Sequence, residues 1–286
     1  MQPLRMFALA TAVLTAATLP VTFTISPASA TTSITATAQA GITYYAYHGF
    51  NSAASDAMIH KLIKQRYRPI AFSVSNAASP RYASSWVKAP GASFWIYQDM
   101  SANGYQQRFN TYRDKGFQPT VVSATGSGND AVFAAIFEKA TGKWFAKHGI
   151  TTAQFNSANK TAAKEGYILT SVNVYGTPSD PRYAAIWSEN RSGMGWAYTY
   201  GKTSAQNSVE FKTRVANGYR PTDIAVAPGG TYTTVWIKDA STPFYAYQGM
   251  SSSGYQRRFE QLRAKGFYPV QVDAENGTYA AVWAKA

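Results

Sequence analysis

The sequence predicts an α+β fold in which five repeated units close into a propeller-like ring. The first observation is a period: segments that open on Gly (Arg in the first copy) followed by an aromatic residue recur every 48 to 52 residues. The second is that each copy contains the same pattern of strands and a helix. The third is that the chain begins and ends on different parts of that pattern. Such a period is typical of repeat architectures, in which neighbouring units share their apolar faces.

Each copy begins with a segment in which apolar and polar residues alternate, which predicts a strand with one buried face. The equivalent triplets are FSV (72–74), VSA (122–124), VNV (172–174), IAV (224–226) and VDA (272–274). A turn rich in Gly, Asn, Ser and Pro leads into a second strand, so the two strands form a hairpin. The second strand carries one large aromatic residue at a constant place, which we expect in the core: Trp86, Phe137, Trp187, Trp236 and Trp283.

The other half of each copy is a short aromatic strand followed by a helix. The strands read YYAYHG, FWIYQD, WFAKHG, WAYTYG and FYAYQG. A Ser, Thr or Asn then stands at or near the expected helix N-cap, and a Gly stands at the expected C-terminus of most helices. The N-caps are Asn51, Ser101, Thr151, Thr203 and Ser251, and the glycines are Gly116, Gly166, Gly218 and Gly266.

The two ends of the chain suggest how the ring closes. The chain opens on a third strand (residues 42–48) and ends on a hairpin (residues 267–285). If the units are ββ-β-α, these first and last fragments complete one unit between them. Joining them removes the exposed sheet edges that a linear array leaves. We therefore predict a closed five-unit toroid, with an open solenoid as the alternative.

Residues 1–30 are expected to be an export signal peptide. Arg5 supplies a positive charge, an apolar run follows from Met6 to about Phe23, and Ala28-Ser29-Ala30 fits a cleavage site. The alternative is a membrane anchor. The run is, however, interrupted by threonines and a proline, and it is short for a span of about 20 apolar residues.

The rest of the chain is expected to be a leader and one domain. Residues 31–41 are small and polar, which is typical of a flexible leader. Residues 42–286 should form a single repeat domain, because a unit that shares its apolar faces with its neighbours cannot be cut out. The chain contains no cysteine, so burial and hydrogen bonds rather than disulfides must stabilise the secreted protein.

The repeats resemble a known family. The motifs that carry the resemblance are the G-[FY]-x-P openings, the Y-A-A-x-W-x-K strands and the A-Y-Q-G-M-S segment that runs into Y-Q-x-R-F. They are similar to the bacterial tandem repeat that also builds the N-terminal domain of the fungal polyglycine hydrolases. The resemblance implies the repeat fold and a secreted setting. It does not imply peptide cleavage, since in that family serine-protease activity belongs to a separate β-lactamase-like domain, which we do not expect in this chain.

Two Ser-x-x-Lys pairs, Ser85/Lys88 and Ser157/Lys160, are the candidate catalytic motifs. In penicillin-recognising hydrolases such a Ser is the nucleophile, but the companion S-D-N and K-T-G motifs occur nowhere in the sequence. Ser85 also takes a place that Ile or Val holds in the other copies, which indicates packing. The histidines His48, His60 and His148 lack metal-ligand spacing. We therefore predict no catalytic residue, no metal and no cofactor, with a serine hydrolase acting on peptides as a second alternative.

Polar residues close the third strands. In a closed ring these positions lie on one circle, where they could form a pocket mouth for a sugar or a peptide. The candidate ligand-binding residues are His48, Gln98, His148, Tyr200 and Gln248, together with Tyr47 and Tyr97. The alternative, which we favour, is that each side chain bonds the N-terminus of a helix in the neighbouring unit. A carbohydrate-stacking surface becomes the better interpretation if Tyr45, Tyr47, Trp95 and Tyr97 face the solvent.

Charge suggests the partner. The formal net charge is +13 at pH 7, and many cations lie near the C-terminal ends of the predicted helices. They complement the helix dipoles, and if the helices ring the outside they also form a basic girdle. We therefore expect a secreted, non-catalytic repeat domain that binds an anionic or glycan partner outside the cell. A structural or adhesive scaffold is the alternative. We expect no specific nucleic acid and no membrane span after signal cleavage, and the oligomeric state is not determined by the sequence.

Overall fold

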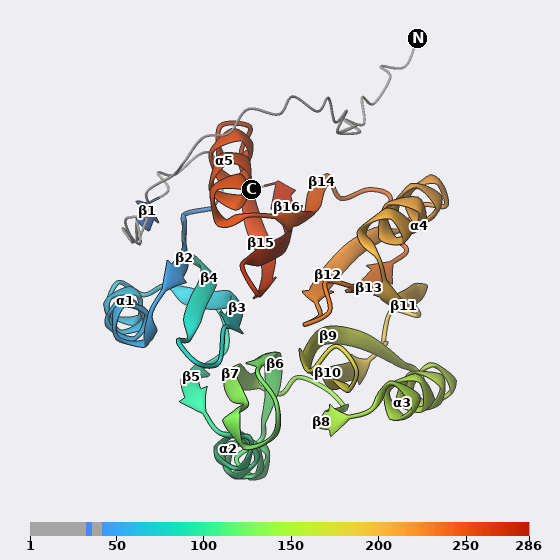
Figure 1. Cartoon of the computed structure of the whole chain (residues 1–286), viewed down its shortest axis with the longest axis horizontal. Coiled ribbons are helices and arrows are strands. Elements are labelled where there is room, and N and C mark those ends of the chain that lie inside the picture. Colours follow the sequence, from blue (N-terminus) through green and yellow to red (C-terminus); the bar gives the residue numbers. More distant parts are fainter. Residues whose placement is uncertain (1–32, 36–41, 286) are drawn as a thin grey trace, which may run out of the picture. The chain divides into compact units, whose positions relative to one another are not determined.

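Each repeat folds into a three-stranded antiparallel sheet and one helix (Figure 1). The structure is a computed structural model, and it describes residues 33–35 and 42–285. Within a unit the chain forms an outer strand, a helix, an inner strand and a middle strand, in that order. The middle strand lies between the other two in the sheet. The helices are α1 (Ser52–Lys64), α2 (Ala102–Asp114), α3 (Thr152–Lys164), α4 (Ser204–Ala216) and α5 (Ser252–Arg263).

The strands fall into three equivalent sets. The outer strands are β2 (Tyr44–Phe50), β5 (Phe94–Met100), β8 (Trp144–Ile150), β11 (Trp196–Lys202) and β14 (Phe244–Met250). The inner strands are β3 (Arg68–Ser75), β6 (Phe117–Thr125), β9 (Tyr167–Gly176), β12 (Arg220–Val226) and β15 (Phe267–Glu275). The middle strands are β4 (Arg81–Val87), β7 (Val132–Lys139), β10 (Pro181–Glu189), β13 (Tyr232–Ile237) and β16 (Thr278–Lys285). A short 3₁₀ helix, η1 (Gly128–Asp130), lies in the turn between β6 and β7.

The boundaries of the units differ from the prediction. The outer strand pairs with the hairpin that follows it in sequence, not with the one that precedes it: β2 pairs with β4, and β14 with β16. Each unit is therefore a contiguous β-α-β-β segment, and the prediction that the first and last fragments complete one unit is wrong. The helix explains the difference, because α1 is 13 residues long and returns the chain by about 20 Å along its own sheet.

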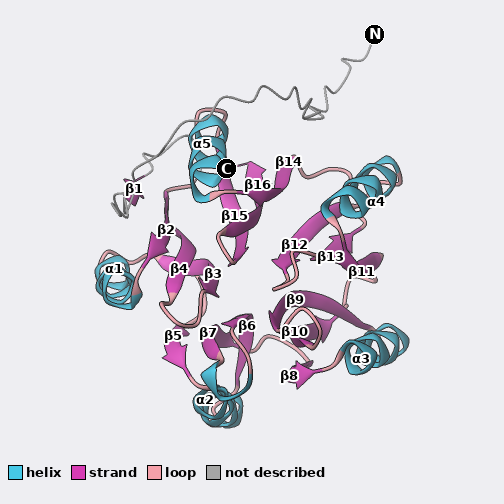
Figure 2. Cartoon of the chain, viewed as in Figure 1, coloured by secondary structure: helices cyan, strands magenta, loops and turns pink. Residues whose placement is uncertain are grey.

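The five units close into a ring, as predicted. The inner strands contact one another in a cycle that runs from β3 through β6, β9, β12 and β15 back to β3. Figure 2 shows the helices around the outside of these strands. The last junction is made by packing and hydrogen bonds rather than by a shared sheet. There the Ser85 hydroxyl donates to the carbonyl oxygen of Pro269 at 2.6 Å, and the Tyr44 hydroxyl donates to that of Phe267 at 3.4 Å.

The helix ends follow the sequence signals. All five predicted N-caps are confirmed, because each side chain accepts a backbone N–H of the first turn. The glycine after α2, Gly116, has a φ of +76°, a conformation that glycine adopts without a Cβ penalty. At the same place after α1 stands Arg66, with a φ of +63°. The first unit therefore carries a strained residue where the others have glycine.

The hydrophobic core lies between the sheets of neighbouring units. The predicted aromatic residues of the middle strands are all fully buried: Trp86, Phe137, Trp187, Trp236 and Trp283. One cluster joins Trp86 of the first unit with Ile136 of the second, and another joins Ala71 of the first with Trp283 of the fifth. The prediction of one buried face was too simple, since polar residues of the inner strands such as Ser73 and Asn173 are buried as well. Packing against neighbours on both sides covers both faces of each sheet.

The N-terminal predictions fall mostly outside the described residues, which do not include 1–32, 36–41 or 286. The predicted signal peptide is among the residues left out. Within the stretch predicted as a flexible leader, β1 (Ser33–Thr35) pairs antiparallel with β2. In the described ranges, 33–35 and 42–285, no helix is long and apolar enough to cross a membrane.

Candidate functional site

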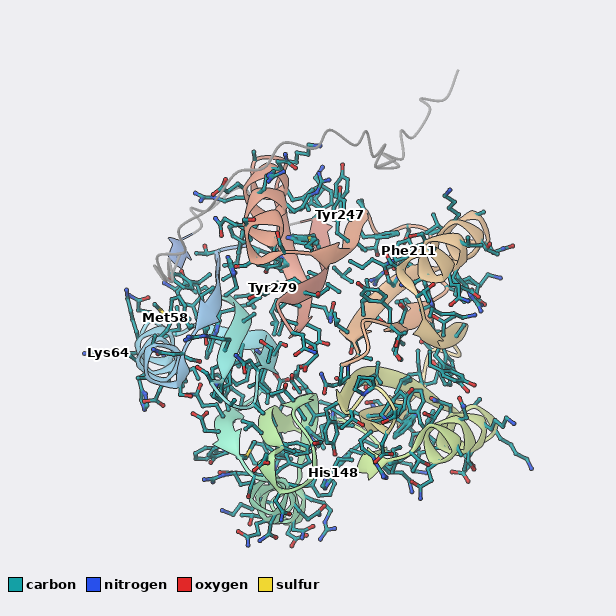
Figure 3. All side chains as sticks on the ribbon, viewed as in Figure 1. Met58, Lys64, His148, Phe211, Tyr247 and Tyr279 are labelled. Atoms are coloured by element: carbon teal, nitrogen blue, oxygen red, sulfur yellow. The ribbon has the colours of Figure 1, made fainter. Side chains whose placement is uncertain are left out.

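The residues that close the outer strands lie at the junctions between units. Four of them bond the first half of the helix in the preceding unit: His48 bonds α5, Gln98 bonds α1, His148 bonds α2 and Gln248 bonds α4. Figure 3 shows His148 at the junction of the second and third units. Tyr200 differs, because its ring stacks on that of Tyr198 with centroids 6.2 Å apart and is 40% exposed. The favoured alternative, in which each strand-end side chain bonds a helix of the neighbouring unit, therefore holds at four of the five positions.

His48 shows how hydrogen bonds and burial fix these side chains in place. Its Nε2 lies 2.9 Å from Oε1 of Gln256, which can only accept, so Nε2–H is the donor. The Ser252 hydroxyl, 3.3 Å from Nδ1, then donates to the second ring nitrogen. Burial lowers the pKa of His48, and burial also lowers that of His148. Both imidazoles are thus favoured in the neutral form and packed against aromatic rings, Tyr255 in the case of His48.

The aromatic residues of the outer strands are not all exposed. Tyr45 and Tyr47 of the first unit are buried, Tyr97 is half-buried, and Trp95 is 47% exposed. The condition set for a carbohydrate-stacking surface, exposure of these aromatic residues, is therefore met by Trp95 and not by the two tyrosines of the first unit. Its outer strand is flanked by β1, where Thr35 is the backbone partner of Tyr45.

A cavity of about 110 Å³ lies among the five inner strands. Each inner strand carries one extra residue relative to its middle strand, and this bulged residue lines the cavity in every unit. The bulged residues are Ile70, Thr120, Thr170, Thr222 and Val270. The volume is well below the roughly 300–1,000 Å³ of typical ligand pockets. None of the predicted strand-end residues lines this cavity, so they do not form its mouth.

Around the cavity, side chains join each inner strand to the one before it. In every unit one polar side chain accepts a backbone N–H from the preceding unit, and the five bonds make a closed cycle, here called the belt. The belt acceptors are Ser73 (from Ala274), Ser123 (from Val74), Asn173 (from Ala124), Asp223 (from Val172) and Asp273 (from Val226), at 2.8–3.1 Å. The belt is not among the features predicted from the sequence. The signal that could have found it is the polar residue at the centre of four of the five inner-strand triplets; in the fourth unit Ala225 holds that place, and the acceptor is Asp223, two residues earlier.

In the part of the chain that the structure describes, three buried carboxyl groups lie on the inner strands, and two of them, Asp223 and Asp273, are belt acceptors. Burial is the main cause that raises the pKa of Asp223 to about 8, of Asp273 to about 6 and of Glu275 to about 7. Asp273 also accepts from the hydroxyl of Ser73 at 2.8 Å, and Glu275 accepts from that of Thr125 at 2.8 Å. These groups bind protons near neutral pH, and their contacts tie the units together.

The Ser-x-x-Lys serines are not placed as nucleophiles. Ser85 is fully buried on β4 and its hydroxyl is committed to Pro269, whereas Ser157 is exposed on α3. His60, exposed on α1, lies beside Asp56 with Nδ1 and Oδ2 3.4 Å apart. Among residues 33–35 and 42–285, no group of three or more metal-ligating side chains is close enough to hold an ion.

Comparison with known families gives the same unit boundaries as the hydrogen bonds. A family model described as a polyglycine hydrolase-like structural repeat matches the chain five times, at residues 41–89, 91–140, 141–190, 193–239 and 241–286. Each match begins just before an outer strand and ends just after a middle strand. The matched repeat is therefore the contiguous β-α-β-β unit.

Proposed function

The chain belongs to the family of polyglycine hydrolase-like structural repeats, and from this premise we propose that it is an exported, non-catalytic domain that binds an anionic polymer outside the cell. The observation that carries the proposal is the distribution of charge. Most carboxylates are buried near the belt or lie beside a cationic side chain or a histidine, while lysines and arginines face outwards from the helices.

The negative charges are largely compensated within the molecule. Asp223, Asp273 and Glu275 are buried. Seven other acidic residues have a cationic side chain, or a histidine in the case of Asp56, at 2.7–3.6 Å: Asp56, Asp114, Glu138, Asp180, Glu189, Glu210 and Asp239. The chain as a whole carries a formal charge of +13, so the excess of positive charge lies at the surface.

The helices supply much of that positive surface. Lys61 and Lys64 of α1 and Lys160 and Lys164 of α3 are exposed near the helix C-termini. Figure 3 shows Lys64 projecting away from the strands. Cations at these places stabilise the helices through the dipole, and their summed field also attracts polyanions. The attraction should weaken with salt, because the Debye length falls from about 30 Å at 0.01 M to about 8 Å at 0.15 M.

The direct test is retention of the whole chain on immobilised polygalacturonate, with an uncharged galactan as the matched support. We expect retention on the acidic support at low ionic strength, little on the neutral one, and release as NaCl rises. Equal retention on the two supports would contradict the proposal. So would a lack of retention on polygalacturonate at about 0.01 M salt, where the Debye length is longest.

A second candidate function is a structural scaffold, and one observation favours it. The outer strands β5, β8, β11 and β14 each end a three-stranded sheet, so in the described residues their outer edges have no neighbouring strand. Such edges can pair with strands of other chains. Sedimentation across a range of protein concentrations tests this: a concentration-dependent assembly supports the scaffold, and a monomer at all concentrations argues against it.

A further inference from the structure

Two of the five units share a set of four side chains where the outer strand meets the second half of the helix. We call this set the clamp. It consists of two aromatic residues on the outer strand, an arginine in the helix and a lysine just after it. The members are Trp95, Tyr97, Arg108 and Lys115 in the second unit, and Tyr245, Tyr247, Arg258 and Lys265 in the fifth.

In the second unit the clamp presents an open indole beside a stacked guanidinium. The Arg108 guanidinium carbon lies 3.8 Å from the centre of the Tyr97 ring. Trp95 is 47% exposed, and its ring lies 5.3 Å from that of Tyr112, to which Tyr97 is hydrogen-bonded through the two hydroxyls. The Lys115 ammonium lies 5.7 Å from the Tyr112 ring.

The fifth unit repeats this arrangement with two parallel rings. The rings of Tyr245 and Tyr247 are 6.5 Å apart and inclined by only 5°. The Arg258 guanidinium lies 4.5 Å from the Tyr247 ring, and the Lys265 ammonium lies 5.5 Å from the Tyr245 ring. Tyr247 lies on β14 beside α5 (Figure 3). Each of the two tyrosine rings thus has a cation over it. The rings belong to residues two apart on the same strand, so the two cations lie side by side along it.

The fold does not require the clamp. The first unit has Met58 and Gln65 where the clamp has arginine and lysine, the third has Ala158 and Glu165, and the fourth has Glu210 and Asn217. All of these units form the same sheet and helix. Packing of the repeat therefore does not explain why arginine, lysine and two aromatic residues occur together twice.

Among the described residues, the cations of the clamp have no carboxylate partner, although Nη1 of Arg258 donates to Oε1 of Gln261 at 2.9 Å and leaves only its other N–H groups to an outside anion. Within residues 33–35 and 42–285, neither Arg108 nor Arg258 forms an ion pair with a carboxylate, and the same holds for Lys115 and Lys265. A guanidinium stacked on a ring has its orientation restricted, while its in-plane N–H groups can still bind a carboxylate through two hydrogen bonds. An exposed indole such as Trp95 offers a flat apolar face to a sugar ring.

We propose that the two clamps are binding sites for an acidic polysaccharide, in which the arginine binds a uronate carboxylate and the outer-strand aromatic residue packs on a sugar ring. This inference rests on the proposed function and adds to it the ligand class and the site. The clamped units are the two neighbours of the first unit in the ring, and a polymer long enough to span the first unit could engage both. Two linked sites then bind far more tightly than either alone.

The charge test compares two double variants that remove the same charge. Arg108→Gln with Arg258→Gln removes the clamp arginines. Lys238→Gln with Lys285→Gln removes two exposed cations outside the clamps, one just after the middle strand β13 and one at the end of the middle strand β16. Binding of each whole chain to polygalacturonate is measured by calorimetry. We expect about tenfold or greater weakening for the arginine pair and less than about twofold for the lysine pair. Equal losses in the two variants would overturn the proposal.

The aromatic test uses Trp95→Ala, which leaves the charge unchanged. Polygalacturonate and inorganic polyphosphate serve as the two polyanions, and the thermal transition confirms that the variant is folded. We expect weaker binding of polygalacturonate and unchanged binding of polyphosphate. If both polyanions bind as tightly as they bind the unmodified chain, the surface recognises charge alone and the clamp proposal fails while the proposed function stands. If the unmodified chain does not bind polygalacturonate at all, both proposals fail.

Discussion

Ser73 in the first unit donates a hydrogen bond to Asp273 in the fifth, with 2.8 Å between its Oγ and Oδ1 of the carboxyl group. The same Ser73 oxygen accepts the backbone N–H of Ala274 at 3.1 Å. One hydroxyl therefore serves as donor and acceptor at the junction where the ring closes. Because no sheet is shared across this junction, its stability depends on such side chains and on apolar packing.

Replacing Ser73 with Ala should destabilise the closed ring. The change removes a bond to a buried carboxyl group and leaves the Ala274 N–H without its acceptor, which we expect to lower the free energy of unfolding by about 2–3 kcal/mol. Urea denaturation measures the loss. Ser157→Ala is the matched control, because Ser157 is exposed on α3 and its replacement should change stability by less than about 0.5 kcal/mol. Equal effects would show that the belt bond at the closing junction contributes little.

The belt carboxyl groups should make the protein less stable as pH rises towards 8. The pKa of Asp223 is raised from 3.8 to about 8 by burial, so the folded state binds its proton more tightly than the unfolded state does. The resulting stabilisation is complete below about pH 4 and is lost as pH rises through 8, at up to about 1.4 kcal/mol per pH unit. His48 and His148, whose pKa values are lowered, oppose this trend only below about pH 6.5. The clearest window is therefore pH 7 to 8.

Asp223→Asn tests whether Asp223 causes the loss of stability at high pH. The amide oxygen can still accept the N–H of Val172, but the side chain carries no charge. We expect the variant to lose most of the decline between pH 7 and 8 and to be more stable than the unmodified chain at pH 8. Urea unfolding at several pH values gives both quantities. A variant with an unchanged pH slope would place the titrating group elsewhere.

Arg66→Gly should stabilise the first unit. Arg66 has a φ of +63° where the other units place glycine, and such a backbone conformation costs a non-glycine residue about 1–2 kcal/mol. We expect a gain of about 1 kcal/mol in the free energy of unfolding. Gly166→Ala is the reciprocal control: a Cβ there would meet no atom within 4 Å, so its expected loss reports backbone strain alone. Backbone strain is refuted as the cause if Arg66→Gly does not raise the free energy of unfolding, or if Gly166→Ala raises it.

His48→Gln should be tolerated, whereas His48→Ala should not. Gln98 and Gln248 hold the equivalent place and bond the preceding helix, so glutamine can replace the bond that His48 makes to α5. We expect the glutamine variant to stay within about 1 kcal/mol of the unmodified chain and the alanine variant to lose about 2 kcal/mol. If the two variants lose stability equally, the imidazole ring itself, through its contacts with Tyr255 and Tyr279, is what matters.

Some features were predictable because they depend on neighbours in sequence. The helix caps, the hairpins and the buried middle-strand aromatic residues follow from local geometry and from the periodic burial of side chains. The belt was not predicted, because alternation of polar and apolar residues has the same pattern whether the polar face meets water or another unit. Ser123 and Asn173 occupy that face and are buried there.

The choice between a closed ring and an open solenoid was decided by the cycle of contacts between the inner strands. By itself, the sequence determined the number of repeats and the kind of element at each place. It could not determine where a unit begins, since a periodic sequence is equally regular wherever it is cut. The tertiary structure decided this through the pairing of β2 with β4. The structure also decided which outer aromatic residues are exposed: Tyr45 and Trp95 hold equivalent positions, yet only Trp95 faces the solvent. Exposure depends on which neighbours cover a position, and that is a property of the folded ring rather than of the repeat.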